Sequence, residues 1–334
     1  MTVSARSRAD VAALLQDIQA PVRDRLDRVP DEMWRICAAD LPLVAEVNQH
    51  LAGMKGKMFR PTLLLLASAV DERPEERAVA IAATLEVLHL ATLVHDDAVD
   101  HSVLRRGMPT VNALFSHQVS VIMGDFLYAR ALTELVRIHD WDVSGVFADA
   151  STTMTLGELR QLGAFEALAF TEADYFALIS AKTASLFRAA CDLGALCGAG
   201  RHRAALARYG ERLGMAFQIA DDLLDYTEGQ EMTGKPTGLD LREHKVTLPL
   251  IGALREMPTA RRRTVEALFE TAEPDDRQVA EVVGIVGEYG GLEYARRRGE
   301  QLAREAEEAL AALPDTIYRA ALVDAIGYVM DRRW

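Results

Sequence analysis

The amino-acid sequence predicts an almost entirely helical protein that folds as one domain. Ala, Leu, Glu and Arg are abundant, and long gaps separate most of the 11 prolines. Apolar residues recur with a period near 3.6 along most of the chain, and no strand pattern, internal repeat or linker stands out. Half of the residues are hydrophobic, so a large core is possible. We expect residues 1–334 to form a single all-α domain.

Charge and cysteine content narrow the possible partners. The net charge of −13 argues against a nucleic-acid-binding protein, because phosphate backbones are bound by basic surfaces. If the ligand is a phosphate, an acidic protein needs a metal ion as an intermediary. Cys37, Cys191 and Cys197 have no C-x-x-C spacing, which indicates neither a zinc site nor a disulfide framework. A reducing cytoplasm fits this pattern.

No segment is typical of a targeting or membrane sequence. Residues 1–30 lack a continuous apolar stretch, and the longest mainly apolar run, residues 63–70, is far shorter than the roughly 20 residues that span a bilayer. We therefore expect a cytoplasmic protein without a cleaved signal and without stable membrane insertion.

Helices and turns alternate from the N-terminus. Residues 8–29 have apolar side chains at helical spacing, interrupted at Pro21, and residues 32–50 form a second helical stretch. Residues 53–61 form a turn with two glycines and three cations, and the apolar helix 62–70 follows it.

Lys57 and Arg60 stand at the start of this apolar helix. Pro61 suits a first helical turn, where its missing N–H is not needed. Backbone N–H groups and the helix dipole favour an anion at such an end. A solvated basic loop is the alternative, but the apolar surroundings favour an anion-binding turn.

Two acidic motifs stand out because each ends an apolar helical run. The first, Asp-Asp-x-x-Asp at residues 96–100, closes a predicted helix over residues 77–100. The second, at residues 221–225, closes a predicted helix over residues 202–226. Carboxylates four residues apart share a helical face and repel one another, a cost that a shared cation offsets. One such motif is typical of a solvated helix end, but two copies favour a metal-binding role.

A turn and further helices connect the two motifs. Residues 101–110 contain Gly, Pro and the adjacent Arg105 and Arg106. These arginines form either a surface salt-bridge patch or a site where guanidinium groups and a metal share one polyanion. Helices are predicted over residues 111–138, 144–168 and 171–196.

Two of these helices carry informative patterns. Residues 119–132 are nearly apolar, which is typical of a buried helix and also consistent with a subunit interface. Lys182 and Thr183 interrupt an apolar face of the later helix, where a lysine commonly extends to the surface.

The C-terminal part begins with the one extended irregular segment of the sequence. Residues 227–244 are polar, contain Lys235 and lie just before Lys245, and loops of this length beside a site are often lids. Three or four amphipathic helices are predicted over residues 260–334.

The ordered motifs resemble the trans-isoprenyl diphosphate synthase, or polyprenyl synthetase, family. The resemblance extends from about residue 44 to residue 251 and is carried by Gly56-Lys57-x-x-Arg60-Pro61, His89, the first acidic motif with Arg105-Arg106-Gly107, Lys182-Thr183, Phe217-Gln218 before the second acidic motif, and Lys235 with Lys245. Each motif is modest, but their ordered concurrence is specific. Lys55, where the family commonly has a glycine, is a minor departure. The resemblance implies one large antiparallel helical bundle with a central cavity.

The resemblance also implies a reaction. A Mg²⁺-dependent prenyltransferase would join isopentenyl diphosphate head-to-tail to an allylic diphosphate, which is dimethylallyl, geranyl, farnesyl or geranylgeranyl diphosphate. Releasing diphosphate requires charge stabilisation on the leaving group, which metal ions supply. About three Mg²⁺ ions per site are implied, held by carboxylates together with substrate phosphates. Members of the family commonly form homodimers.

The implied site residues form distinct groups. Metal binding is implied for Asp96, Asp100 and Asp221, with Asp97, Asp222 and Asp225 in direct or supporting roles. The allylic diphosphate would be bound by Arg105, Lys182, Lys235 and Lys245. Isopentenyl diphosphate would be bound without metal by Lys57, Arg60, His89 and Arg106. The developing cation would face oxygen dipoles from Thr183 and Gln218, and the departing diphosphate would take the proton.

Product length is implied by the residues one turn before the first motif. Short-chain members of the family carry an aromatic residue at one of the positions that Ala91 and Thr92 occupy here. Neither residue is large, so a product longer than farnesyl is expected. Closure of the tunnel at a deeper level is expected from Leu88, Met123, Leu127 or Leu132.

Other functions account for fewer of the motifs. Glu86-x-x-His89 is one half of a di-iron motif whose second copy the sequence lacks. His95-Asp96 resembles an HD-type metal phosphohydrolase, which leaves the second acidic motif and the cationic loops unexplained. A class I terpene cyclase shares the helical fold but usually has a different second metal motif. A non-catalytic subunit usually lacks the acidic residues that are all present here.

Overall fold

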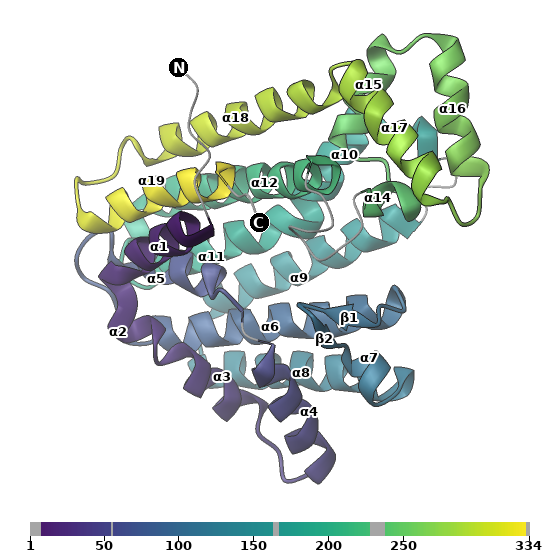
Figure 1. Cartoon of the computed structure of the whole chain (residues 1–334). Helices are drawn as coiled ribbons and strands as arrows, with labels where there is room; N and C mark the ends of the chain where they lie inside the picture. The colour runs from purple at the N-terminus through teal and green to yellow at the C-terminus, as the bar shows by residue number, and fades with distance from the viewer. Residues whose placement is uncertain (1–7, 55, 163–166, 228–237, 332–334) are drawn as a thin grey trace.

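The regular structure of this chain is almost entirely helical (Figure 1). The computed structural model describes residues 8–54, 56–162, 167–227 and 238–331. Within these ranges the strands are the antiparallel pair β1 (Leu104–Arg105) and β2 (Met108–Pro109), of two residues each. The predicted all-α class is confirmed.

The elements follow the order of the predicted helices. Those before the second acidic motif are α1 (Arg8–Gln19), η1 (Ala20–Val22), α2 (Arg23–Leu26), α3 (Val29–Cys37), α4 (Pro42–Gly53), α5 (Phe59–Ala69), α6 (Ala78–Val99), the β1–β2 hairpin, α7 (Val111–Leu114), α8 (His117–Ile138), α9 (Trp141–Leu162), η2 (Ala167–Ala169), α10 (Glu172–Ile179), η3 (Ser180–Ala184), α11 (Ser185–Leu196) and η4 (Gly200–His202). The remaining helices are α12 (Arg203–Thr227), α14 (Leu239–Arg242), α15 (Leu248–Glu256), α16 (Thr259–Glu270), α17 (Asp276–Glu288), α18 (Gly291–Leu310) and α19 (Ile317–Met330).

Several predicted helices are interrupted for local reasons. The helix predicted over residues 8–29 contains a 3-10 turn around Pro21, as its ring requires. The helix predicted over residues 111–138 breaks before Ser116, whose hydroxyl accepts a hydrogen bond from the Val119 N–H and caps α8. The helix predicted over residues 171–196 contains the π-helical turn η3, which a regular 3.6-residue period does not anticipate.

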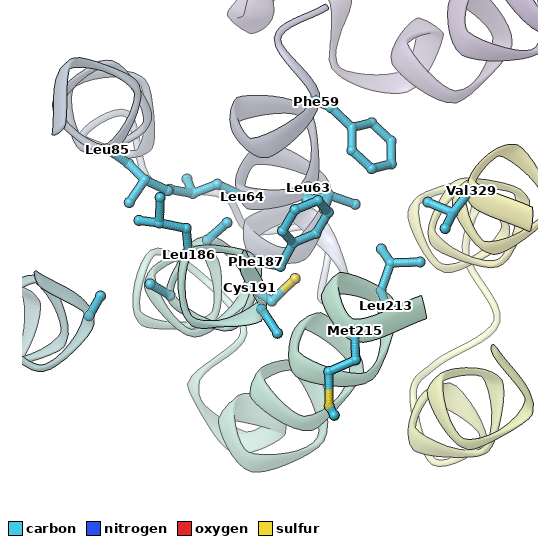
Figure 2. Close-up of a cluster of buried hydrophobic side chains, with 14 of the residues drawn as sticks. Phe59, Leu63, Leu64, Leu85, Leu186, Phe187, Cys191, Leu213, Met215 and Val329 are labelled. Atoms are coloured by element: carbon cyan, nitrogen blue, oxygen red, sulfur yellow. The ribbon is translucent and has the colours of Figure 1, made fainter. Parts of the chain in front are cut away.

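The core forms where α5, α6, α11 and α12 meet. α11 packs against the other three helices and against α9. Figure 2 shows Leu63 and Leu64 of α5, Phe187 of α11 and Leu213 of α12 in one cluster of apolar side chains, and all four are buried. Burial of this apolar surface holds in place the helices that carry the polar motifs.

Glycine permits the close approach of α12 to the π-helical turn. A Cβ added to Gly214 would lie 2.6 Å from the Ala184 Cα, closer than two carbon atoms can pack. In the part of α12 that precedes Gln218, the backbone therefore packs directly against the backbone of η3.

Both acidic motifs lie near the C-terminal ends of their helices. The β1–β2 hairpin, which follows α6, and α14, which follows α12, lie on the same side of the bundle, on the right in Figure 1. Chain direction therefore brings the two motifs to one end of the molecule.

The apolar stretch of residues 119–132, for which the sequence left a core and a subunit interface open, is only partly buried within this chain. Met123 and Leu127 of α8 are buried, whereas the side chain of Ile122 is 66% exposed and Leu132 is also exposed. The apolar residues occupy two faces of α8, and only one of them packs on the core of this chain.

One described helix, α6, is long and apolar enough to span a bilayer by length and composition alone. This finding differs from the expectation, based on residues 63–70, that no apolar run is long enough to span a bilayer. Most of the apolar segment of α6 is buried by neighbouring helices, as in the core helix of a globular domain.

Candidate active site

The first acidic motif ends α6 and contains one paired and two less buried carboxylates. Asp97 is only 5% exposed, and both of its oxygens accept from the Arg105 Nε, at 2.9 and 2.8 Å. Asp96 is partly buried and Asp100 is exposed. Burial raises the pKa of Asp96 to about 6, with Lys182 opposing the shift and Glu158 and Asp100 adding to it. The motif therefore offers Asp96 and Asp100 on the same helical face.

The two adjacent arginines that follow this motif lie at a tight turn, Arg105 in β1 and Arg106 in the turn itself. Arg106 and Gly107 both have left-handed backbones, with φ of 52° and 76°, which close the β1–β2 hairpin. Arg105 turns back onto Asp97, whereas the Arg106 guanidinium donates to the carbonyl oxygen of Met54 at 2.9 Å. Two arginines adjacent in sequence thus reach different parts of the site.

Arg106 joins the cationic turn that precedes α5. The Arg60 guanidinium lies 2.9 Å from the His89 Nε2 and stacks over the Phe187 ring at 4.8 Å. Lys57 lies at the same turn, with its Nζ 5.8 Å from the centre of the Tyr328 ring. Arg60 and Arg106 interact electrostatically with one another and with His89. The structure therefore brings together the four residues predicted to bind isopentenyl diphosphate.

The tautomer of His89 follows from this geometry. A guanidinium can only donate, so the His89 Nε2 accepts and its ring proton is on Nδ1. Burial and the charges of Arg60, Arg106 and Arg105 hold the pKa of His89 well below its ordinary value. The Nδ1 of His89 and the Nε of Arg60 are buried without a partner among the described residues. This cluster thus contains two buried donors that no described residue satisfies.

Glu86 belongs to the same cluster as Arg60, His89 and Arg106 and was not predicted as a site residue. Burial raises the pKa of its carboxyl, and the charges of Arg60 and Arg106 oppose that shift. Its charged neighbours among the described residues are Arg60 and Arg106, which are cations and not the ligands of a di-iron site. The sequence signal was available, because Glu86 precedes His89 by one helical turn on α6.

The second acidic motif, on α12, has the same division between buried and exposed carboxylates. Asp222 is 5% exposed and accepts from the Tyr175 hydroxyl at 2.5 Å and from the Gln218 amide at 2.8 Å. Burial raises its pKa to about 7 in spite of these hydrogen bonds. The Asp225 carboxylate accepts from the backbone N–H groups of Leu239 and Asp240, at 2.9 and 3.0 Å, while Asp221 is exposed.

Asp240 adds a further carboxyl that sequence reasoning missed. It lies just after the segment for which no placement is described, and burial together with Asp222 and Asp225 raises its pKa to about 8. Lys245 interacts with Asp240 and also with Asp100 of the first motif. Although burial lowers the pKa of Lys245, Glu243 and these two aspartates raise it above its ordinary value. Lys245 therefore links the first acidic motif electrostatically to Asp240, which itself interacts with the second motif.

Lys182 and Thr183 enter the site from the π-helical turn η3. The Lys182 ammonium lies 2.7 Å from a carboxylate oxygen of Glu158 and interacts with Asp96. The Thr183 hydroxyl donates to the Gln218 Oε1 at 2.7 Å. Glu158, which was not predicted as a site residue, thus orients Lys182 close to the first acidic motif. The predicted residue Lys235 and most of the predicted lid, residues 227–244, lie outside the described residues.

The donor chemistry of the two motifs fits Mg²⁺. This hard cation prefers oxygen ligands and is usually bound by one or two carboxylates together with substrate phosphates. Within the described ranges no three His, Cys, Asp or Glu side chains are grouped as a ready metal cage. The exposed Asp100 and Asp221 and the partly buried Asp96 fit a site completed by a phosphate ligand.

The residues predicted to control product length lie on α6 below the first motif. Ala91 is buried, and the Thr92 hydroxyl donates to the carbonyl oxygen of His89 at 2.8 Å. Leu88, Met123 and Leu127 are buried as expected for a tunnel lining or a core. Leu132 is 46% exposed, so it does not close the interior of this chain.

Comparison with known families gives the decisive observation. A sequence model of the family described as polyprenyl synthetase matches residues 41–286. The chain belongs to this family.

Two similar proteins of this family are named for long products. An all-trans-nonaprenyl-diphosphate synthase (geranyl-diphosphate specific) of Rhodobacter capsulatus is 38% identical over 95% of this chain and 98% of its own length. An octaprenyl diphosphate synthase of Escherichia coli is 37% identical over 85% of this chain and 88% of its own.

Solved structures of similar synthases have the same fold. A decaprenyl diphosphate synthase of R. capsulatus superposes with a TM-score of 0.89 at 35% identity, covering 95% of this chain and 98% of that one. A polyprenyl synthase of Caulobacter crescentus, complexed with calcium and isoprenyl diphosphate, has a TM-score of 0.90 at 31% identity, covering 96% and 98%. The predictions of this family, of its fold and of a prenyltransferase are confirmed, and the terpene cyclase and phosphohydrolase alternatives are not supported.

Binding of Mg²⁺ is expected to release protons near neutral pH. With pKa values raised to about 6 at Asp96, about 7 at Asp222 and about 8 at Asp240, the metal-free protein holds protons that a cation displaces. The release should shrink as pH rises above these values, because the carboxyls are then already ionised. Calorimetric titration of Mg²⁺ in buffers of different ionisation enthalpy measures it at pH 7 and, as an internal control, at pH 9. Heats independent of the buffer at pH 7 would contradict the shifted values.

Proposed function

We propose that this enzyme condenses isopentenyl diphosphate head-to-tail with an allylic diphosphate to form an all-trans polyprenyl diphosphate. The observation that carries the proposal is the presence of two chemically different anion subsites at one end of the bundle. One subsite is rich in cations and is built from Lys57, Arg60, His89 and Arg106, with Glu86 beside the two arginines. The other combines cations with two acidic motifs. Two diphosphates, one bound with metal and one without, match this arrangement.

The acidic subsite would hold Mg²⁺ through Asp96, Asp100 and Asp221. Asp97, Asp222 and Asp225 would support these ligands, since each already accepts hydrogen bonds from within the protein. About three ions per site are expected, bound mainly between carboxylates and phosphates. Bound Mg²⁺ supplies Lewis-acid stabilisation of the leaving diphosphate.

The cationic and polar side chains of the site would bind the two substrates. Arg105, Lys182 and Lys245 would hold the allylic diphosphate, together with Lys235 from the segment outside the described residues. Thr183 and Gln218 would present oxygen atoms to the allylic cation. The neutral imidazole of His89 would donate its Nδ1 proton to isopentenyl diphosphate while its Nε2 orients Arg60.

A product longer than farnesyl is supported by the small side chains before the first motif. Ala91 and Thr92 are small where short-chain members of the family carry an aromatic residue, and the helix they occupy packs against α8. Relatives named for octaprenyl, nonaprenyl and heptaprenyl products support the same length class.

A second copy of this chain is proposed to cover the outer faces of α8 and α9. These faces expose large apolar side chains, with Val136 at 76% and Trp141 at 86% exposure, and they also carry Ile122, Leu156 and Leu159. Apolar surface of this kind is typical of a subunit interface. The buried free thiols of Cys37, Cys191 and Cys197 support a reducing compartment, so we place the homodimer in the cytoplasm.

Product analysis with defined substrates tests the function. The enzyme is incubated with Mg²⁺, labelled isopentenyl diphosphate and dimethylallyl, geranyl, farnesyl or geranylgeranyl diphosphate in turn, and the dephosphorylated products are sized by chromatography. We expect polyprenyl products longer than farnesyl that require both substrates and Mg²⁺. Release of phosphate or diphosphate without isopentenyl diphosphate, and without a longer chain, would indicate a hydrolase or a cyclase instead.

A bulky side chain at position 91 should shorten the product. Ala91→Phe would place an aromatic ring into the path of the growing chain one turn below Asp96, so the main product should shift by several isoprene units. Product sizing under the same conditions measures the shift, and the rate of the first condensation serves as the control for an intact site. An unchanged product distribution would place the tunnel elsewhere.

A further inference from the structure

The π-helical turn η3 changes which residues of its helix share a face. Tyr175 and Thr183 are eight positions apart. At about 100° per residue, that spacing leaves two side chains of a regular α-helix roughly 80° out of phase. A π-helical turn inserts about one extra residue, which reduces the difference to roughly 20°. Ser180–Ala184 is such a turn, so Tyr175 and Thr183 both face α12.

The two residues contact α12 at two positions one helical turn apart. The Tyr175 hydroxyl donates to the Asp222 Oδ2 at 2.5 Å, and the Thr183 hydroxyl donates to the Gln218 Oε1 at 2.7 Å. The Gln218 Nε2 donates to the Asp222 Oδ1 at 2.8 Å and joins these contacts. The result is a continuous hydrogen-bonded chain from Tyr175 through Asp222 and Gln218 to Thr183.

The hydrogen bonds in this chain have a fixed direction. Both oxygens of Asp222 accept, so the amide nitrogen of Gln218 faces Asp222 and its carbonyl oxygen faces Thr183. A threonine hydroxyl has one proton, and the proton of Thr183 is used on Gln218. Toward any other group, Thr183 can therefore act only as an acceptor.

We propose that Tyr175 is a positioning residue that acts through Asp222 and Gln218 to hold Thr183 as a hydrogen-bond acceptor for the cationic end of the allylic substrate. This inference rests on the proposed function. Tyr175 is 2% exposed and belongs to none of the motifs that bind substrate. An oxygen that presents only lone pairs stabilises a positive charge, whereas a hydroxyl free to turn its proton inward would oppose it.

A double-mutant cycle tests whether Tyr175 works through Thr183. Tyr175→Phe should lower kcat roughly 10–100-fold, as for other residues that orient a ligand, with little change in the KM for isopentenyl diphosphate. In a Thr183→Ala background the same substitution should change kcat by less than about threefold, because the group that it orients is absent. Thr183→Ser, which keeps the hydroxyl, should retain most of the turnover.

The matched control is another fully buried tyrosine, Tyr209 of α12. Its hydroxyl donates to the carbonyl oxygen of Leu322 at 2.6 Å, so Tyr209→Phe also removes one buried hydrogen bond. It should lower the melting temperature by an amount similar to that for Tyr175→Phe while leaving kcat unchanged. Equal losses of kcat in the two tyrosine variants would assign Tyr175 a merely structural role and overturn the proposal.

Asp222→Asn provides a second variant. It preserves the shape of the side chain and reverses the direction of some of the hydrogen bonds. The new amide would donate to the Gln218 Oε1, the Gln218 Nε2 would then donate to Thr183, and the Thr183 proton would be released toward the substrate. At saturating Mg²⁺ we expect Asp222→Asn to lower kcat, and we expect the part of this loss that acts through Thr183 to be absent in a Thr183→Ala background. The proposal is overturned if either Tyr175→Phe or Asp222→Asn reduces kcat by the same factor with and without Thr183, or has no effect.

The outcomes separate this inference from the proposed function. If the unmodified enzyme makes a polyprenyl product and the cycle is additive, only the role of Tyr175 is wrong. If the unmodified enzyme makes no such product from isopentenyl and allylic diphosphates, both are wrong.

Discussion

The structure depends on holding like-charged groups close together at one end of an apolar bundle. Carboxylates of the two acidic motifs repel one another, and so do the guanidinium groups of the cationic subsite. Partners inside the protein reduce this cost. Arg105 pairs with Asp97, Tyr175 donates to Asp222, and Glu86 opposes the mutual repulsion of Arg60 and Arg106. In the proposed function, the charge that these partners leave uncompensated would bind diphosphate and metal.

The core and the site are built from the same contacts. α11 packs on α5, α6 and α12, and these helices end in, or contain, the residues of the site. Gly214 brings α12 against the π-helical turn, and this approach sets the distance at which Gln218 meets Thr183. A change in the packing of these helices would therefore move the polar groups directly, without an intervening flexible loop.

Sequence reasoning predicted the features that depend on the type and order of residues, and it missed those that depend on three-dimensional contact. Helical periodicity located most helices, and the ordered motifs identified the family and the residues now found together around His89. Glu158 and Asp240 were missed because their links to the predicted site residues run through neighbours distant in sequence, Lys182 for Glu158 and Asp222 and Asp225 for Asp240. Tyr175 was missed because a regular helical period places it on a different face from Thr183. Composition alone could not show that the outer apolar face of α8 is exposed rather than buried in the core.

The division of the site between Arg105 and Arg106 is the most direct point to measure. Steady-state kinetics of Arg105→Gln and Arg106→Gln, with each substrate varied in turn, compares two neighbouring residues of equal charge. Loss of a hydrogen bond to a charged group should weaken binding roughly 10–100-fold. We predict that Arg106→Gln raises KM for isopentenyl diphosphate alone, and that Arg105→Gln weakens use of the allylic diphosphate. Equal effects of both variants on both substrates would contradict two separate diphosphate subsites.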